Sequence, residues 1–509
     1  MQPLLLKPPA PPASARPVDR ATLSRPAAPP SVGVLASAAL TGLAAAVTLR
    51  SGIGANLLVC AAVLAGGAGV TAHRTGRRIR PWTVLWTVAV LALLAVPVVS
   101  ASAWPTLLAV CAALGIGSLA LHGGRRWAGV GLGLLGLWAH LGPAVGWAAA
   151  ALRALRYPGR TKLAVAVRTA AVTAVLLIVF GLLFGTADSQ VGSILGSMLP
   201  TVSVGDTPLR VLLFALGTLL ALTAAHTAAA PRRWDRTRIP AGRQRSRLEW
   251  ALPLGLLNLL FGVFVGVQLA VLFRSGSIYR RTGLFPAEYA RQGFWQLLWV
   301  LVLTLLVVAL ATYWAPRSTA GDRRLVKSML GLLCTLTLVV VVSALYRMKL
   351  YVDAFGLSRL RLSVAGVEIW LGVVFVLLIA GGILSSRAWL PRAVVLSAAV
   401  GLAVYGLIRP DALIAEQNVA RYRQTGQIDI GYLRDLSADA APALDGLPDD
   451  MRACALQGIS DNAVAPDAPW YAISLSDART RAILRARPVT SPDDACARIG
   501  VPLYNPLGE

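Results

Sequence analysis

Long uninterrupted runs of apolar residues dominate the pattern of hydrophobic and polar positions along this chain. A transmembrane helix needs about 20 apolar residues to cross roughly 30 Å of hydrocarbon. Such runs predict helices, because an open sheet in lipid would leave its edge groups without hydrogen bonds. By this criterion we predict about eleven spans: residues 32–49, 53–72, 81–99, 104–122, 163–186, 207–230, 248–273, 294–315, 326–347, 362–384 and 392–408.

The segment 127–152 is long enough to cross the membrane but contains Gly142-Pro143 near its middle. Proline lacks a backbone donor and clashes with the preceding turn, so it breaks a helix there. A full span would also place Arg153 and the basic residues after it on the charge-poor side of the membrane. We therefore predict two short helices that lie in the inner interface or form a re-entrant segment.

Composition supports a multi-pass membrane protein. Of 509 residues, 56% are hydrophobic and 14% are charged, which excludes a disordered chain, a soluble enzyme and a coiled coil. The net charge of +25 is typical of a nucleic-acid binder, but its distribution argues against nucleic acid as a partner. Residues 1–408 carry 38 basic and nine acidic side chains, whereas residues 409–509 carry ten and fourteen. Most of the basic residues lie in short loops between apolar runs, as membrane topology requires.

Charge and proline content together predict three regions. Residues 1–31 are a disordered, Pro-rich arm; residues 32–408 are the transmembrane domain; residues 409–509 are a small helical tail. With the amino terminus in the cytoplasm, 28 of the 38 basic residues before the tail fall on the inner side. An odd number of spans then places the tail outside the cytoplasm.

The tail holds two cysteines, Cys454 and Cys496, for which an extracytoplasmic location would permit a disulfide. Two free buried thiols are the alternative. We predict tail helices from Pro410 to the residue before Gly426 and from an N-cap at Ser476 to Pro488.

Motifs for known catalytic chemistry are absent from the sequence: it contains no phosphate-binding loop, no HExxH, no CxxC and no GxSxG. The four histidines, His73, His122, His140 and His226, are scattered along the chain. We therefore predict no metal, no cofactor and no catalytic residue.

Basic residues on the predicted outer side need a local reason, since insertion disfavours them there. Eight of them concentrate in two connections, near residues 274–291 and 347–361, and three of the nine acids of residues 1–408 lie close by. The candidate ligand-binding residues are Glu288, Arg291, Arg347, Tyr351, Asp353, Arg359, Arg361 and Glu368.

Spacing places several of these residues on shared helix faces. Glu288 and Arg291 are three apart, and Arg347 and Tyr351 are one turn apart. Glu368 lies seven residues after Arg361, at a depth where a carboxylate is costly unless it is paired. Arg361, Arg359 or an arginine of the other connection would be its partner. Three interpretations stay open: helices locked by a charge network, an outward-facing anion pocket, and a catalytic constellation.

Four blocks carry a resemblance to a known family: LNLLFGVFVGVQLAVLF, PAEYARQGFWQLLWV, SALYRMKLYVDAFGLSRLRL and RPDALIAEQNVARYRQTGQIDIGYLRDLSADAAPAL. In this order they resemble a bacterial polytopic membrane family known only as a domain of unknown function, over roughly residues 163–445. The resemblance implies an integral membrane protein and supplies no mechanism.

These observations together predict an all-α, polytopic helix bundle of the bacterial plasma membrane with a helical extracytoplasmic cap. We expect it to bind or translocate an anionic ligand, such as a lipid headgroup or an envelope precursor, because guanidinium groups pair with phosphate through parallel donors. A lipid-linked glycosyl or phosphoglycosyl transferase is one alternative. A non-catalytic scaffold or sensor is the other.

Overall fold

The structure of the protein is a computed structural model. It describes residues 27–77, 80–154, 169, 207–236, 247–273, 294–314, 319–384, 388–461, 468–490 and 492–500. Within these ranges every regular element is a helix, which confirms the predicted all-α class. Two compact units divide the chain: residues 1–98, 111–238 and 467–474 form the first, and residues 99–110, 239–466 and 475–509 form the second.

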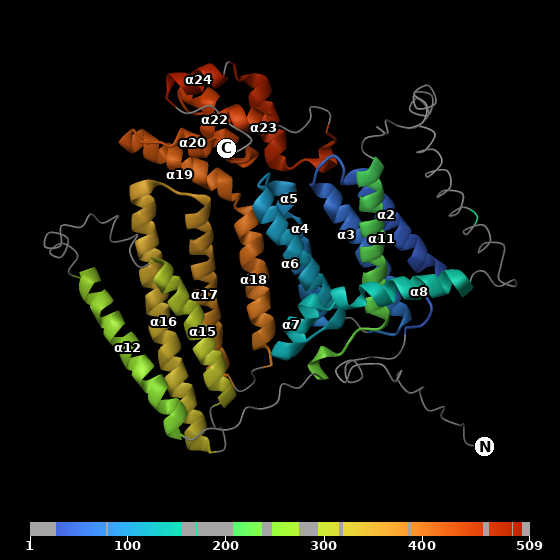
Figure 1. Ribbon diagram of the computed structural model, residues 1–509, viewed down its shortest axis with the longest axis horizontal. Helices are drawn as coiled ribbons and strands as arrows, with labels where there is room; N and C mark the ends of the chain where they lie inside the picture. Colours follow the sequence, from blue (N-terminus) through green and yellow to red (C-terminus); the bar gives the residue numbers. More distant parts are fainter. Residues whose placement is uncertain are drawn as a thin grey trace. The chain divides into compact units, whose positions relative to one another are not determined.

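The first unit is built around α11 (Thr207–Ala229), which packs against α2 (Val32–Thr48), α3 (Ala55–Arg74) and α8 (Leu141–Ala154) (Figure 1). Its other helices are α4 (Pro81–Leu94), most of α5 (Val96–Val99), residues 111–122 of α6 (Ala103–His122), α7 (Trp127–Leu135) and the short η1 (Trp138–His140), η3 (Trp234–Arg236) and η5 (Trp470–Ala472). Gly42 lets α2 and α11 approach closely, because a Cβ there would lie 2.1 Å from the Thr218 hydroxyl.

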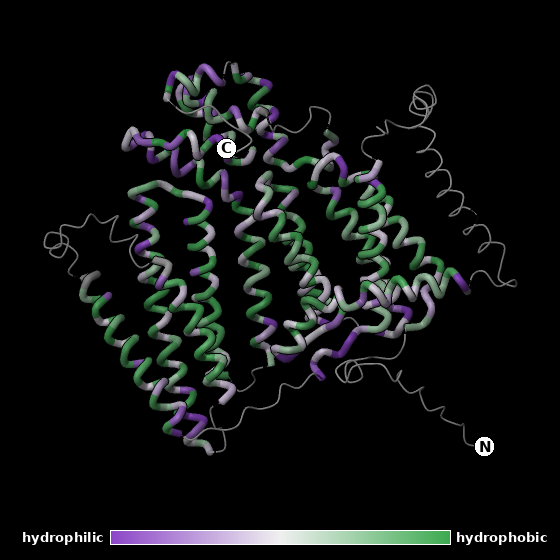
Figure 2. Tube along the Cα trace, viewed as in Figure 1, coloured by the Kyte–Doolittle hydropathy of each residue, from purple (hydrophilic) through white to green (hydrophobic). Residues whose placement is uncertain are grey.

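The second unit contains a bundle of five apolar helices: α12 (Arg247–Phe273), α15 (Phe294–Trp314), α16 (Ala320–Phe355), α17 (Arg359–Ile383) and α18 (Leu390–Leu407). Its core lies where α12, α15 and α17 meet α16, and Leu301, Leu333 and Phe375 are fully buried there. Hydrophobic residues line the middle of these helices, and polar residues gather toward the ends of α12, α16 and α17 (Figure 2). This is the distribution expected of helices that cross a membrane.

A cap of short helices covers the start of α17 and the end of α18 in the same unit (Figure 1). Its elements are α19 (Pro410–Thr425), α20 (Ile430–Leu433), η4 (Ala438–Ala440), α21 (Ala441–Leu444), α22 (Asp449–Asp461), α23 (Leu475–Ala486) and α24 (Pro492–Arg498). Ile414, Leu433, Leu444 and Leu456 form its own buried core. Cys454 of α22 and Cys496 of α24 are joined in a disulfide with a Cα–Cα distance of 4.9 Å.

Nine helices of the described residues are long and apolar enough to cross a membrane, or ten if the bent pair α7 and α8 forms one span. The nine helices coincide with nine of the predicted spans. A tenth predicted span coincides with α2, which has 17 residues and is shorter than a full span. The predicted span 163–186 and most of the predicted arm lie outside the described residues. The fold is a polytopic helix bundle, as predicted.

The bend in the segment 127–152 lies earlier than predicted. Here α7 ends at Leu135, η1 follows, and α8 starts at Leu141, with an angle of 61° between the two helical parts. Pro143 falls in the first turn of α8, where a missing backbone donor has no intrahelical acceptor to lose. The break predicted at Gly142-Pro143 is therefore too late by nearly two turns, and the interfacial or re-entrant location stays a prediction.

Candidate functional site

The second predicted connection turns out to be mostly helix. We predicted a span ending near residue 347, but α16 continues to Phe355, and only Gly356, Leu357 and Ser358 separate it from α17. Gly356 has a φ of +79°, and a Cβ there would lie 2.2 Å from Asn418 Oδ1, so the turn requires glycine. Arg347, Tyr351 and Asp353 consequently lie on the last turns of α16. Glu288 and Arg291, of the first connection, lie outside the described residues.

Side chains from α17 and α19 bind the carbonyl groups at the end of α16. Arg361 donates from Nη1 to the carbonyls of Phe355, at 3.1 Å, and Gly356. Arg421 donates to the carbonyl of Ala354 at 2.7 Å. The last carbonyls of a helix lack intrahelical donors and carry partial negative charge, so cations are stabilising there. Capping of α16 is thus a structural reason for an arginine at position 361.

Arg359 and Asp411 form a buried ion pair between α17 and α19. Two hydrogen bonds join them, from Nε at 2.8 Å and from Nη2 at 2.6 Å, and the Ser437 backbone N–H adds a third to Asp411 at 2.9 Å. Asp411 is fully buried. Burial by itself would raise the pKa of Asp411, but the donors of Arg359 and Ser437 outweigh it and hold the pKa below its usual value. The pair fastens the cap to the bundle.

The remaining predicted residues near the cap have separate surroundings. Arg347 donates to Gln268 Oε1 of α12 at 2.9 Å, and Ser343 donates to the same oxygen. The Tyr351 ring lies under the Arg361 guanidinium, 4.3 Å from its central carbon, in a cation–π contact. Asp353 is exposed. Among the predicted residues that it describes, the structure therefore brings Tyr351 and Arg361 into contact.

Glu368 lies on α17 and has no exposed surface. Neither of its carboxylate oxygens has a hydrogen-bond partner among the described residues. The predicted pairing with Arg359 or Arg361 is not formed, because Arg359 binds Asp411 and Arg361 binds the end of α16. Charge attraction alone favoured those pairs. The tertiary structure, however, places competing acceptors closer to the two arginines: Asp411 of α19 and the last carbonyls of α16.

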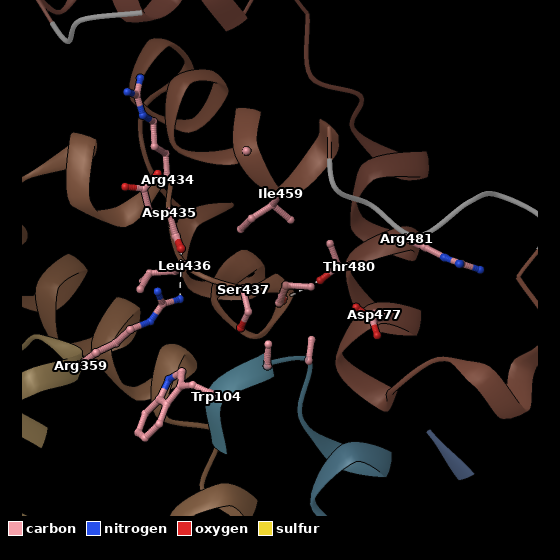
Figure 3. Close-up of a pocket in the computed structure, with 14 residues that line it drawn as sticks. Trp104, Arg359, Arg434, Asp435, Leu436, Ser437, Ile459, Asp477, Thr480 and Arg481 are labelled. Atoms are coloured by element: carbon pink, nitrogen blue, oxygen red, sulfur yellow. Dashed lines mark hydrogen bonds between the residues drawn. The ribbon is translucent and has the colours of Figure 1, made fainter. Parts of the chain in front are cut away.

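A cavity of about 670 Å³ opens between the first residues of α6 with the loop before them, the start of α17 and the cap. It is lined by Ala101, Ala103, Trp104, Arg359, Arg434, Asp435, Leu436, Ser437, Ala438, Gly458, Ile459, Asp477, Thr480 and Arg481. In Figure 3, Arg359 points toward the backbone of Asp435, to whose carbonyl it donates at 3.1 Å, and Arg434 and Arg481 extend outward from opposite sides. Of the six predicted residues that the structure describes, Arg359 alone lines this cavity.

Sequence reasoning missed Trp104, Arg434, Thr480 and Arg481. Residues 101–104 gave no signal of a site, because the loop near 97–104 carries no charge. The tail arginines have the pattern of ordinary solvated residues. The Trp104 indole N–H is buried without a hydrogen-bond partner among the described residues, and its ring packs edge-on against Tyr405 at 5.1 Å. An aromatic residue near the predicted end of a span was the available signal, since tryptophan is enriched at membrane interfaces.

Asp439 of the cap holds the loop that precedes α6. It accepts hydrogen bonds from the hydroxyls of Ser100, at 2.6 Å, and Ser102, at 2.8 Å, and from the Ala101 N–H at 3.0 Å. All three donors belong to one short loop, so a single buried carboxylate fixes that wall of the cavity relative to the cap.

Three histidines that lie far apart in the sequence meet in the first unit. His140 and His226 have their Nδ1 atoms 2.9 Å apart, and the ring centroids of His122 and His140 are 5.3 Å apart. They meet because η1 and the ends of α6 and α11 converge. Among the described residues, however, no group of three or more His, Cys, Asp or Glu side chains is arranged to hold a metal ion.

Comparison with known proteins identifies a family. The family described as "Domain of unknown function (DUF4153)" matches residues 87–447, a longer stretch than the predicted 163–445. The comparisons with curated proteins and with solved structures each gave no match. Since the match covers well over half of the 509 residues, this polytopic membrane protein belongs to the DUF4153 family.

Proposed function

We propose that the protein binds the anionic headgroup of a lipid, or of a lipid-linked envelope precursor, in the cavity between the cap and the first residues of α6 and α17. The observation that carries this proposal is the cavity itself, which combines three arginines with an apolar wall of Trp104, Leu436 and Ile459. A lipid-derived ligand offers both a charge and an apolar part. Under the predicted topology the site faces the outer side of the bacterial plasma membrane.

The position of the cavity along the helices supports an amphiphilic ligand. Ala103 and Arg359 are the first residues of α6 and α17, both apolar enough to span a membrane, and both residues line the cavity. The cavity therefore lies at the level where these helices leave the hydrocarbon. Helix N-termini carry partial positive charge, so the starts of α6 and α17 add to the attraction for an anion.

Free donors in the cavity support an anionic headgroup. Arg359 uses Nε and Nη2 for Asp411 and the Asp435 carbonyl, and its Nη1 has no hydrogen-bond partner in the described part of the chain. The Trp104 indole N–H is a second donor without a partner there. Arg434 and Arg481 also line the cavity and add positive charge to it. Asp435 and Asp477 moderate the charge and would orient these arginines.

Lipid discrimination tests the proposal. The full chain in detergent is titrated with a fluorescent short-chain phosphatidylglycerol and with the matching phosphatidylcholine. We expect tighter binding of phosphatidylglycerol, and we expect the double variant Arg434→Ala, Arg481→Ala to weaken it about tenfold, which is about 1.4 kcal/mol. Phosphatidylcholine binding should change little.

Arg485→Ala is the matched control, because Arg485 lies on α23 like Arg481, is exposed and does not line the cavity. Equal affinity for the two lipids, or equal effects of the Arg485 variant and the double variant, would refute an anion site in this cavity. The transferase and scaffold alternatives stay predictions.

A further inference from the structure

Glu368 differs from the other buried acids of the described residues. Asp322, Asp411 and Asp439 are each less than 5% exposed, as Glu368 is, and each has a donor at 3.0 Å or less. Asp322 pairs with Arg247, Asp411 with Arg359, and Asp439 with two serine hydroxyls. Glu368 has no hydrogen bond to either oxygen in the described part of the chain. Its burial therefore needs a different explanation.

The surroundings of Glu368 on its own helix are apolar. Val364, Leu371, Gly372 and Phe375 lie three to seven residues from it, on the same face of α17, and all are buried. A Cβ on Gly372 would lie 3.3 Å from Val341, so this face packs closely against α16. Glu368 lies one turn before Leu371 and Gly372, on the side nearer the cap. It borders the apolar core that Leu371 and Phe375 share with Val341 and Ala344.

Charged and titratable groups on the neighbouring elements have other partners or lie on the surface. On α17 itself, Arg359 and Arg361 bind Asp411 and the end of α16. On α16, Arg347 binds Gln268, Tyr351 stacks under Arg361, and Lys349 and Asp353 follow on the last turns. On α18, Tyr405 contacts the Ser363 hydroxyl, and on α19 Asp411 is paired. In the described residues none of them forms a hydrogen bond with Glu368.

An ionised carboxylate in such a place would lose its hydration without gaining a counter-ion. A carboxylate in this situation takes up a proton and becomes neutral, because burial is far more costly for the charged form than for the neutral form. Intramembrane carboxyl groups of this kind mark proton pathways in membrane proteins. We propose that Glu368 is a proton-binding site in the α16–α17 interface, occupied at neutral pH, where the carboxyl group of the folded protein is the neutral acid.

Release of this proton would place a negative charge between α16 and α17. The charge would then require water, a cation or one of the nearby arginines as a new partner, so the packing of the two helices would have to change. Arg359 stands nine residues before Glu368 on the same helix, at the start of α17. A proton at Glu368 therefore provides a means of coupling pH to the end of α17 that carries the cap.

Labelling with dicyclohexylcarbodiimide tests the protonation state in the full chain. This apolar reagent adds the protonated carboxyl group across its N=C=N unit, so it modifies acids that are neutral and buried in apolar surroundings. We expect an adduct on the peptide that contains Glu368 at neutral pH, its loss in Glu368→Gln, and a decline as the pH is raised. A water-soluble carbodiimide should instead label the exposed Asp353.

Infrared spectroscopy of the unlabelled protein provides a second measurement, which does not depend on access of a reagent. We expect the carbonyl band of a protonated carboxylic acid at neutral pH, shifted in heavy water and absent in Glu368→Gln. Absence of that band from folded wild-type protein, together with no adduct on Glu368, would overturn the proposal and show that the group is ionised with a counter-ion.

Discussion

Asp411 and Glu368 are equally buried acids in the same unit, yet their environments are opposite. Asp411 accepts hydrogen bonds from Arg359 and from the Ser437 N–H, whereas Glu368 has none among the described residues. The donors that stabilise the Asp411 carboxylate also fasten α19 to α17, whereas the Glu368 carboxyl group lies on a closely packed apolar helix face. The comparison teaches that burial alone does not assign a role to an acid: the supply of donors decides whether it is a structural anion or a neutral acid.

Removal of the disulfide should give the largest loss of stability, and it should affect the surroundings of Asp411 and Glu368 differently. Cys454 and Cys496 are 42 residues apart, and closing a loop of this size stabilises a fold by about 4 kcal/mol in the chain-entropy model. We expect the double variant Cys454→Ala, Cys496→Ala to destabilise the cap by about this amount. Hydrogen exchange should increase around Asp411 and stay low around Glu368. Equal increases at both sites would show that cap and bundle unfold as one body.

Removal of Arg359 should give the next largest effect, because it leaves Asp411 buried without its counter-ion. Breaking a buried pair costs about 3–5 kcal/mol, and we expect about 3 for Arg359→Ala because Arg359 is itself partly exposed. Denaturant unfolding of the full chain in detergent measures the change. Arg485→Ala, at an exposed position, should alter stability by less than about 0.5 kcal/mol. A loss for Arg359→Ala no larger than for this control would refute a stabilising pair.

Replacement of Glu368 by leucine should act in the opposite direction. A buried polar group without a partner costs about 1–3 kcal/mol, so we expect Glu368→Leu to raise the free energy of unfolding by about that amount. Asp411→Leu should lower it, because the guanidinium of Arg359 would lose its acceptor. If both leucine variants lose stability equally, Glu368 has a favourable partner after all.

Acid should reveal the smallest difference. The pKa of Asp411 lies below its usual value near 4, so the unfolded chain binds a proton there more readily than the folded chain. The stability from this group is complete above about pH 4 and is lost as the pH falls through the folded pKa. Thermal unfolding between neutral pH and about pH 3 should show this loss, and Asp411→Asn should remove part of it. Glu368→Gln should instead enlarge the loss, because the folded chain already holds a proton at Glu368 at neutral pH whereas the unfolded chain takes one up only as the pH falls through about 4.3. In the wild type this offsets part of the loss at Asp411.

The arginines at the cap end of the bundle show how far sequence reasoning can go. Their location against the charge bias predicted a local reason, and the structure supplies one for Arg359 and another for Arg361. Their partners could not be predicted, because Asp411 is 52 residues from Arg359 and the carbonyls of α16 became acceptors only where that helix ended. The cavity was missed for a similar reason, since Trp104 and Thr480 share it from opposite ends of the chain.

The sequence by itself determined that this protein is a polytopic bundle of helices, because the length of an apolar run and the charge of a loop are local properties that lipid tests directly. It also marked Glu368 as an unusual acid. Only the tertiary structure decided which buried acids have donors: Asp439 depends on serines more than 330 residues away, and Glu368 on the packing of α17 against α16. Hydrogen bonds act over about 3 Å in space, and sequence distance does not report that separation.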